Sequence, residues 1–161
     1  MGTTTKISGL AEIKINMGKV EKALLKAARK PIRKALTAGA NDLKKSIRPN
    51  VPVLKSAASF RAKGTVKKNV RHKTKVAKDG LSGRTFIGIR RAGKKRMARV
   101  GENTRDNTDP FYWWMVNYGT QKMPGRHFIE KGASQGKDRA LKTTAQTFLE
   151  EFKKETKNII K

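Results

Sequence analysis

Lysine and arginine are the residues of this chain whose number and spacing could do chemistry. The chain carries 39 of them against 12 Asp and Glu in 161 residues, a formal net charge of +27. Sixteen of these cations and only two acids lie between Arg61 and Arg105. Such a cluster neutralises phosphates by counterion release, which is independent of base sequence. The charge therefore predicts a nucleic acid or an acidic protein surface as the partner, with a membrane surface a weaker candidate.

The candidate polyanion-binding residues lie on a predicted strand and in the basic loop that follows the strands. Cations alternate with apolar or neutral residues over 65–76, which projects a row of charge from one strand face. The stretch 92–109 has no periodicity and is predicted to be a mobile basic loop. Because Phe86 is the only aromatic residue between Arg61 and Arg105, base stacking and specific readout are not expected. The predicted polyanion-binding residues are Lys67, Lys68, Arg71, Lys73, Lys75, Arg90, Arg91, Lys94, Lys95 and Arg96.

Catalytic chemistry is not indicated by any residue pattern. His72 and His127 are the only histidines. We expect His72 to be exposed within a basic run, and His127 to pack against its aromatic neighbour in a turn. The sequence shows no nucleophile beside a base, no metal-ligand spacing and no phosphate-binding glycine loop. We therefore predict a protein without enzymatic activity, cofactor or metal, and a small basic nuclease or toxin is the enzymatic alternative.

Two segments show the apolar period of amphipathic helices. The first runs from Lys19 to Ile47, with a kink at Pro31 or, alternatively, a second helix that begins at Pro31. The second begins at about Lys137, with Ser134 as a possible cap. Gly132 and Gly136 are expected to weaken any helix that continues back towards Ile129.

Between the helices the pattern changes to strands over about 65–76, 84–91 and 112–118. This order predicts an α+β fold, in which the two long helices pack on a small, mostly antiparallel sheet of three to four strands. We expect a single domain over 1–161. The absence of cysteine excludes disulfides and fits synthesis inside a cell, and no export signal or membrane-spanning stretch is visible.

The segment from Phe111 to Tyr118 is unusually aromatic. Read as a strand, it is apolar on both faces, so that the helices of its own subunit cover only one of them. The other face then needs a further layer or another subunit. The alternative is a central strand that lies wholly within one subunit.

The order of features in 111–133 resembles the tail-completion or head-tail connector family of long-tailed double-stranded DNA phages, similar to the lambda Z type. In that family an aromatic strand runs into a Gly-Thr turn, then a Pro and Phe segment and a C-terminal helix. The chain departs from the pattern at Asn117, where an acidic residue is common, and at Lys131-Gly132, where a proline is usual. The matching residues are Tyr112, Trp113, Val116, Tyr118, Gly119, Thr120, Pro124, Phe128 and Ala133.

The resemblance implies a structural virion protein of the head-tail junction, synthesised in the host cytoplasm. Its subunits would form a homo-oligomeric, six-fold ring that joins the tail tube to the head, contacts other neck and tail proteins and passes DNA through its lumen, without a membrane. The alternative is a stand-alone, sequence-independent nucleic-acid-binding protein of ribosome-associated or chromatin-like type. The predicted subunit-interface residues are Trp113, Trp114, Tyr118, Gly119, Thr120 and Phe128.

Overall fold

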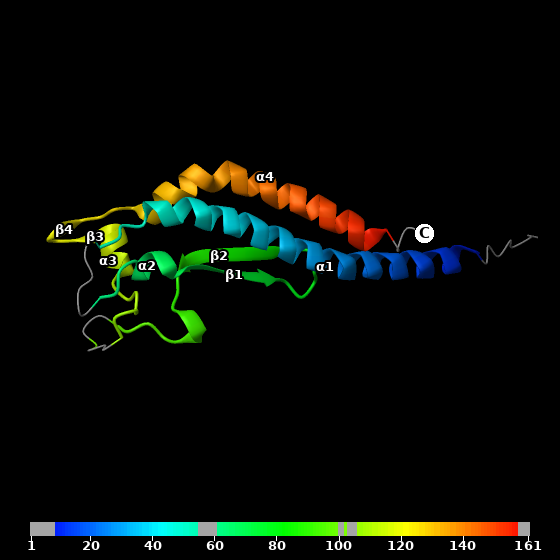
Figure 1. Ribbon diagram of the computed structural model, residues 1–161. Coiled ribbons are helices and arrows are strands. Elements are labelled where there is room, and N and C mark those ends of the chain that lie inside the picture. Colours follow the sequence, from blue (N-terminus) through cyan, green and yellow to red (C-terminus); the bar gives the residue numbers. More distant parts are fainter. Residues whose placement is uncertain (1–8, 55–60, 100–101, 103–105, 158–161) are drawn as a thin grey trace, which may run out of the picture.

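Two long helices and two small antiparallel sheets make up the fold, which confirms the α+β class (Figure 1). The computed structural model describes residues 9–54, 61–99, 102 and 106–157; the side chains of 9–19 and Lys94 are outside the described part. The elements in chain order are α1 (Gly9–Asn50), α2 (Thr65–Lys68), β1 (Val70–Val76), β2 (Gly83–Ile89), the 3-10 turn η1 (Ala92–Lys94), α3 (Trp113–Tyr118), β3 (Gly119–Thr120), β4 (Met123–Pro124) and α4 (Phe128–Thr156).

The elements are stacked with α1 in the middle (Figure 1). Helix α4 runs antiparallel along one side of α1, and the β1–β2 hairpin lies along the other side. The N-terminal part of α1 continues beyond the end of α4 (Figure 1). None of the described helices has the length and apolar character that crossing a membrane requires.

Helix α1 is one continuous helix through Pro31, so the two-helix alternative is wrong. The proline lies with the buried residues of the α1 surface. Its missing N–H and its ring are costly inside a helix, but packing against neighbouring elements can offset that cost. The helix also runs through Pro49 and ends at Asn50, just before Val51 and Pro52.

Helix α4 begins at Phe128, nine residues before the predicted start at Lys137. The prediction treated Gly132 and Gly136 as helix breakers, whereas both lie inside the helix and face α1. A Cβ at Gly132 would collide with the backbone of Ile47, and one at Gly136 with Ser46. The glycines therefore allow a close helix crossing, and Ser134 is an exposed residue inside the helix instead of its cap.

A ladder of polar contacts fixes the register of α1 against α4. Lys30 contacts Glu155 at 2.6 Å, and Lys34 pairs with Glu151. Further along, the Thr143 hydroxyl donates to the Asp42 carboxylate at 2.7 Å. The same order continues with Ser46 to Arg139 at 2.9 Å and Asn50 to Gln135 at 2.8 Å. Each step along α1 is matched by an equal step back along α4, as two antiparallel helices in continuous contact require.

The main hydrophobic core lies at one end of the stack, where the C-terminal end of α1 meets α2, α3 and the start of α4. Tyr112, Trp113 and Val116 pack against its edge. Along the rest of the α1–α4 contact the buried residues are small, which agrees with the close approach of the two helices. The buried core residues are Ile47, Val51, Val66, Val70, Ile89 and Phe128.

Candidate polyanion-binding face and candidate subunit interface

The outer face of the β1–β2 hairpin carries the predicted row of cations. Along β1 the side chains of Arg71, Lys73 and Lys75 are exposed. The alternate residues, beginning with the buried Val70, face α1. The alternation was thus predicted correctly from residue 70 onward, while residues 65–68 form the short helix α2 instead of the start of the strand.

Strand β2 adds an aromatic side chain to this basic face. Phe86 is 55% exposed and lies opposite Lys73 in the strand register. The guanidinium of Arg84 stands 5.5 Å from the centre of the Phe86 ring. An exposed ring between two cations offers one base-stacking position on an otherwise electrostatic surface.

Most of the other predicted polyanion-binding residues lie around the hairpin. Lys67, Lys68, Arg90 and Lys95 are exposed around the hairpin, as a polyanion surface requires, and their binding role stays a prediction. Lys94 belongs to η1, but its side chain lies outside the described part.

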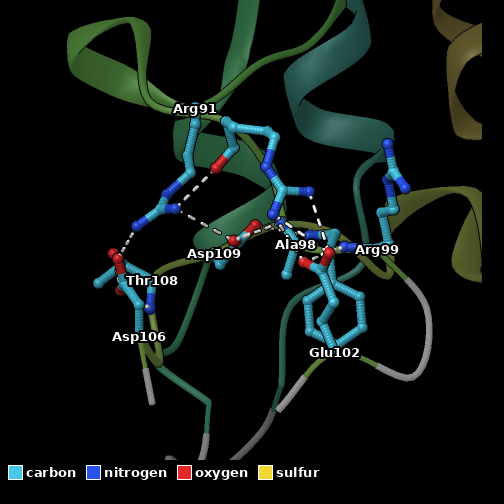
Figure 2. Close-up of polar contacts among 9 residues, drawn as sticks. Arg91, Ala98, Arg99, Glu102, Asp106, Thr108 and Asp109 are labelled. Atoms are coloured by element: carbon cyan, nitrogen blue, oxygen red, sulfur yellow. Dashed lines mark hydrogen bonds and ion pairs between the residues drawn. The ribbon is translucent and has the colours of Figure 1, made fainter. Parts of the chain in front are cut away.

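Arg91, by contrast, is committed to an internal network (Figure 2). Its guanidinium pairs with Asp106 and lies 3.2 Å from the carboxylate of Asp109, which is fully buried. The same carboxylate accepts hydrogen bonds from the backbone N–H groups of Ala98 at 2.9 Å and Phe111 at 3.1 Å. These contacts place counter-charges beside Arg91 inside the fold, and its role in polyanion binding stays a prediction.

A second ion pair in the same loop reduces the free charge further (Figure 2). Arg96 contacts Glu102 at 3.1 Å, and the backbone N–H of Arg99 donates to that carboxylate at 2.9 Å. The hydrogen bond from Arg99, followed by that from Arg96, lowers the pKa of Glu102. The described part of the loop thus carries its own counter-charges, and its predicted mobility stays a prediction.

His72 was expected to be exposed, but it lies on the inner face of β1 and is half-buried. Burial is the main cause that lowers the pKa of its imidazole, and the nearby Lys44 ammonium lowers it further. Lys44 and Arg48 come from α1, line a pocket with His72, and were not among the predicted polyanion-binding residues. Their separation of one helical turn puts them on one face, a signal that the sequence contained.

The aromatic segment is a helix, α3, and not a strand. In a helix the residues that meet are three or four apart, so Trp113 and Val116 pack together against the core. Trp114 and Tyr118 share another side, where they are 38% and 57% exposed. The apolar residues of the segment fit the period of a strand as well as that of a helix. Six residues are too few for periodicity to distinguish the two.

Phe128 is fully buried in the core of its own subunit, so it cannot contact a neighbouring subunit and its assignment to the interface is wrong. The same burial explains the early start of α4, whose first residue is Phe128. Trp113 is largely packed within the subunit. Of the predicted interface aromatics, Trp114 and Tyr118 are the two that this end of the molecule exposes.

Asn117 links α3 to the start of α4. Its side chain is fully buried, and its Oδ1 accepts the backbone N–H of Ile129 at 3.2 Å. Its amide group donates to both carboxylate oxygens of Glu130, at 3.1 and 3.0 Å. The residue before the helix, His127, provides no side-chain cap. Asn117 therefore takes over the capping role from outside the helix.

The Gly-Thr turn follows directly on α3. Gly119 has φ 89° and ψ −178°, a conformation that is essentially restricted to glycine. Its strand β3 pairs with β4, so that Gly119 lies opposite Pro124 and the exposed Thr120 opposite Met123. The backbone conformation of this turn therefore favours glycine at position 119.

More apolar side chains are exposed at the same end of the molecule. Val53, Leu54 and Met123 are 38%, 45% and 38% exposed and border one pocket of about 190 Å³. Together with Trp114 and Tyr118 we call them the apolar end. Its residues are distinct from the cations of the hairpin face.

Comparisons with protein-family models, with curated proteins and with solved structures found no match to this chain. Within the described residues, no three His, Asp or Glu side chains are grouped so as to hold a metal ion.

Proposed function

We propose that this chain is a structural subunit of the head-tail junction of a long-tailed double-stranded DNA phage, and that it assembles into a ring which joins the tail tube to the head. The observation that carries the proposal is the separation of two surfaces on one subunit. The apolar end exposes Trp114 and Tyr118, while the hairpin face exposes cations. In this proposal the first surface contacts neighbouring subunits, and the second faces DNA in the lumen or an acidic neighbour.

The apolar end supports a role in assembly. Two large aromatic side chains, an exposed methionine and two aliphatic residues lie near one another at one end of a small subunit. Large apolar side chains exposed together at one end of a molecule are typical of a protein interaction site. Aromatic residues and methionine are also enriched at interface cores.

The projecting part of α1 supports the same role. An isolated helical segment is only marginally stable in water, so it needs a packing partner. In the subunit the N-terminal part of α1 runs beyond α4 (Figure 1). A neighbouring subunit in a ring would supply a packing partner for this part of α1.

The resemblance to connector proteins supports the identity of the assembly. The Gly119-Thr120 turn and the helix that follows it keep the order expected of that family, although the aromatic residues before the turn are helical. The resemblance also favours a structural over an enzymatic role.

A stand-alone nucleic-acid-binding protein is the second candidate, and the hairpin face favours it. Arg71, Lys73 and Lys75 form their row within one subunit, so they need no assembly to attract a polyanion.

Sedimentation velocity and negative-stain electron microscopy of the full chain separate the two candidates. The ring proposal expects a discrete oligomer that persists at high salt, because apolar contacts are not screened, and closed particles in the images. A monomer at every salt and protein concentration, even with tail proteins added, would overturn the ring and leave the nucleic-acid-binding role.

A further inference from the structure

A basic pocket lies where the C-terminal part of α1 passes α2 and the start of β1. Its volume is about 240 Å³. No carboxylate of the described residues lines it. The lining residues are Lys44, Arg48, Lys68, Val70, Arg71 and His72.

The fold holds these cations in place. Lys44 and Arg48 are one turn apart on α1, and His72 faces them from the inner side of β1. The Arg48 guanidinium also makes a weak hydrogen bond of 3.5 Å to the carbonyl oxygen of Val70. The side chains therefore converge through secondary structure, and not through a loop.

The pocket differs from the other charged clusters of the subunit. Lys30, Lys34, Lys45, Arg91 and Arg96 each have a carboxylate partner. In the pocket, burial lowers the pKa of Lys44, and the like charges of Arg48 and Arg71 lower it further. Cations held together without a counter-charge are unfavourable in the free protein, and a bound anion would relieve that repulsion.

A second basic depression continues from the pocket along the hairpin. It has a volume of about 740 Å³ and shares Arg71 and His72 with the first. Lys73, Arg90 and Lys95 also line it. Two adjoining basic depressions fit an anion with several linked charges better than a single free ion.

We propose that Lys44, Arg48 and Arg71 bind one phosphate of a nucleic-acid backbone, and that the adjacent phosphates follow the larger depression past Lys73 and Arg90. Guanidinium groups match phosphate oxygens through paired hydrogen bonds, and the lysine supplies a point charge. The site is built within one subunit. Phosphate binding at this site therefore does not require ring assembly, and it can be tested separately from assembly.

Anisotropy of a fluorescein-labelled DNA duplex, measured over a series of salt concentrations, tests the site. Arg48→Gln and Lys44→Gln should each weaken duplex binding and flatten the slope of log K against log salt, and replacing Lys44, Arg48 and Arg71 together by Gln should lower the magnitude of that slope by about 0.9, the value for one phosphate neutralised by the protein. The matched control is Lys45→Gln, which removes the same charge from the next residue, where the lysine is exposed and pairs with Asp42. Equal slopes for Lys44→Gln and Lys45→Gln would overturn the proposal.

The melting temperature and the pKa of His72, followed by NMR, distinguish phosphate binding from a purely structural role of the pocket residues. Lys44→Gln should raise the melting temperature of the free protein while it weakens DNA binding, because it removes unpaired charge from the pocket. Binding of the duplex should raise the pKa of His72, followed at its imidazole proton. An unmoved His72, or displacement of the duplex by poly-glutamate of equal charge at equal concentration, would show that the pocket is not a nucleic-acid phosphate site.

Discussion

At the scale of single residues, the junction between α3 and α4 depends on side chains that have no substitute. Asn117 acts as acceptor and donor at once, which no aspartate could do in the same contacts. Glu130 supplies the negative charge near the start of α4, and the neutral amide connects it to the helix.

Asn117→Asp should destabilise the subunit, because it places a second carboxylate against Glu130 and removes the donor. A loss of about 1–3 kcal/mol is expected for a buried polar group left in conflict. Adding Glu130→Gln should recover most of that loss, since the partner can then donate. Urea unfolding of the two single variants and the double variant measures the coupling. Additive effects would contradict the proposed contact.

Gly119→Ala should also be destabilising. An added Cβ would lie 2.6 Å from the Gly125 nitrogen and 2.7 Å from the Met123 oxygen, both backbone atoms. The glycine-only conformation adds a strain of about 1–3 kcal/mol. Gly88→Ala on β2 is the control, because no atom lies within 4 Å of its Cβ position and its φ is not positive. Thermal unfolding should separate the two variants, and equal melting temperatures would show that the turn tolerates a side chain.

At the scale of elements, periodic sequence patterns correctly predicted the type and the buried face of those elements whose structure is determined by neighbouring residues. The alternation of β1 and the apolar stripe of α1 are repeated over enough residues to fix both type and facing. The six residues of α3 are too few, and their structure depends on the core beneath Trp113. The start of α4 was missed because Gly132 is unfavourable in a helix by propensity alone. In the structure, Gly132 allows close packing against Ile47, which is distant in sequence.

Gly132→Ala should therefore reverse the usual sign of a helical Gly→Ala change. At an open helical position the change stabilises by about 0.5–1 kcal/mol. Here the new methyl would meet the Ile47 backbone, and overpacking costs typically about 1–3 kcal/mol. Ser134→Ala, exposed on the same helix, should change stability by less than about 0.5 kcal/mol. A Gly132→Ala variant that melts at a higher temperature than wild type would refute the close crossing.

The hairpin and α2 should bind polyanions without regard to sequence. Replacing Lys67, Lys68, Arg71, Lys73 and Lys75 by Gln should flatten the salt dependence of duplex binding by about 0.9 for each phosphate that is no longer neutralised. The change should be the same for unrelated sequences, because phosphate contacts carry no base information. Replacing the five exposed residues Lys131, Lys137, Lys142, Lys153 and Lys157 is the control of equal charge. An equal loss in the control would assign the effect to net charge alone.

At the scale of the whole molecule, the exposed cations of the hairpin and the exposed aromatic residues of α3 lie on different elements. The α1–α4 pair is fixed in register by polar contacts such as Lys30 to Glu155 and Asp42 to Thr143. The hairpin lies along one side of this pair and α3 lies at its end (Figure 1). The hairpin exposes Arg71, Lys73 and Lys75, and α3 exposes Trp114 and Tyr118. Such an arrangement allows assembly and polyanion contact to be altered separately by mutation.

Substitutions of the two tryptophans of α3 test folding and assembly separately. Trp114→Ala should leave the monomer folded, since its side chain is 38% exposed, but should abolish the oligomer, because a truncated aromatic anchor typically costs about 2 kcal/mol or more at an interface. Trp113→Ala should unfold the subunit, since that indole packs against the core. Urea unfolding and sedimentation velocity measure the two effects.

Leu149→Ala, which shortens an apolar side chain 56% exposed on α4, is the control for the loss of exposed apolar surface and should change neither property. In phage particles, Trp114→Ala should yield heads and tails that fail to join. An oligomer of wild-type stability in Trp114→Ala would remove the apolar end from the interface. The ring would then have to be built from another surface, of which the projecting part of α1 is the next to test, by shortening it and repeating the sedimentation measurement.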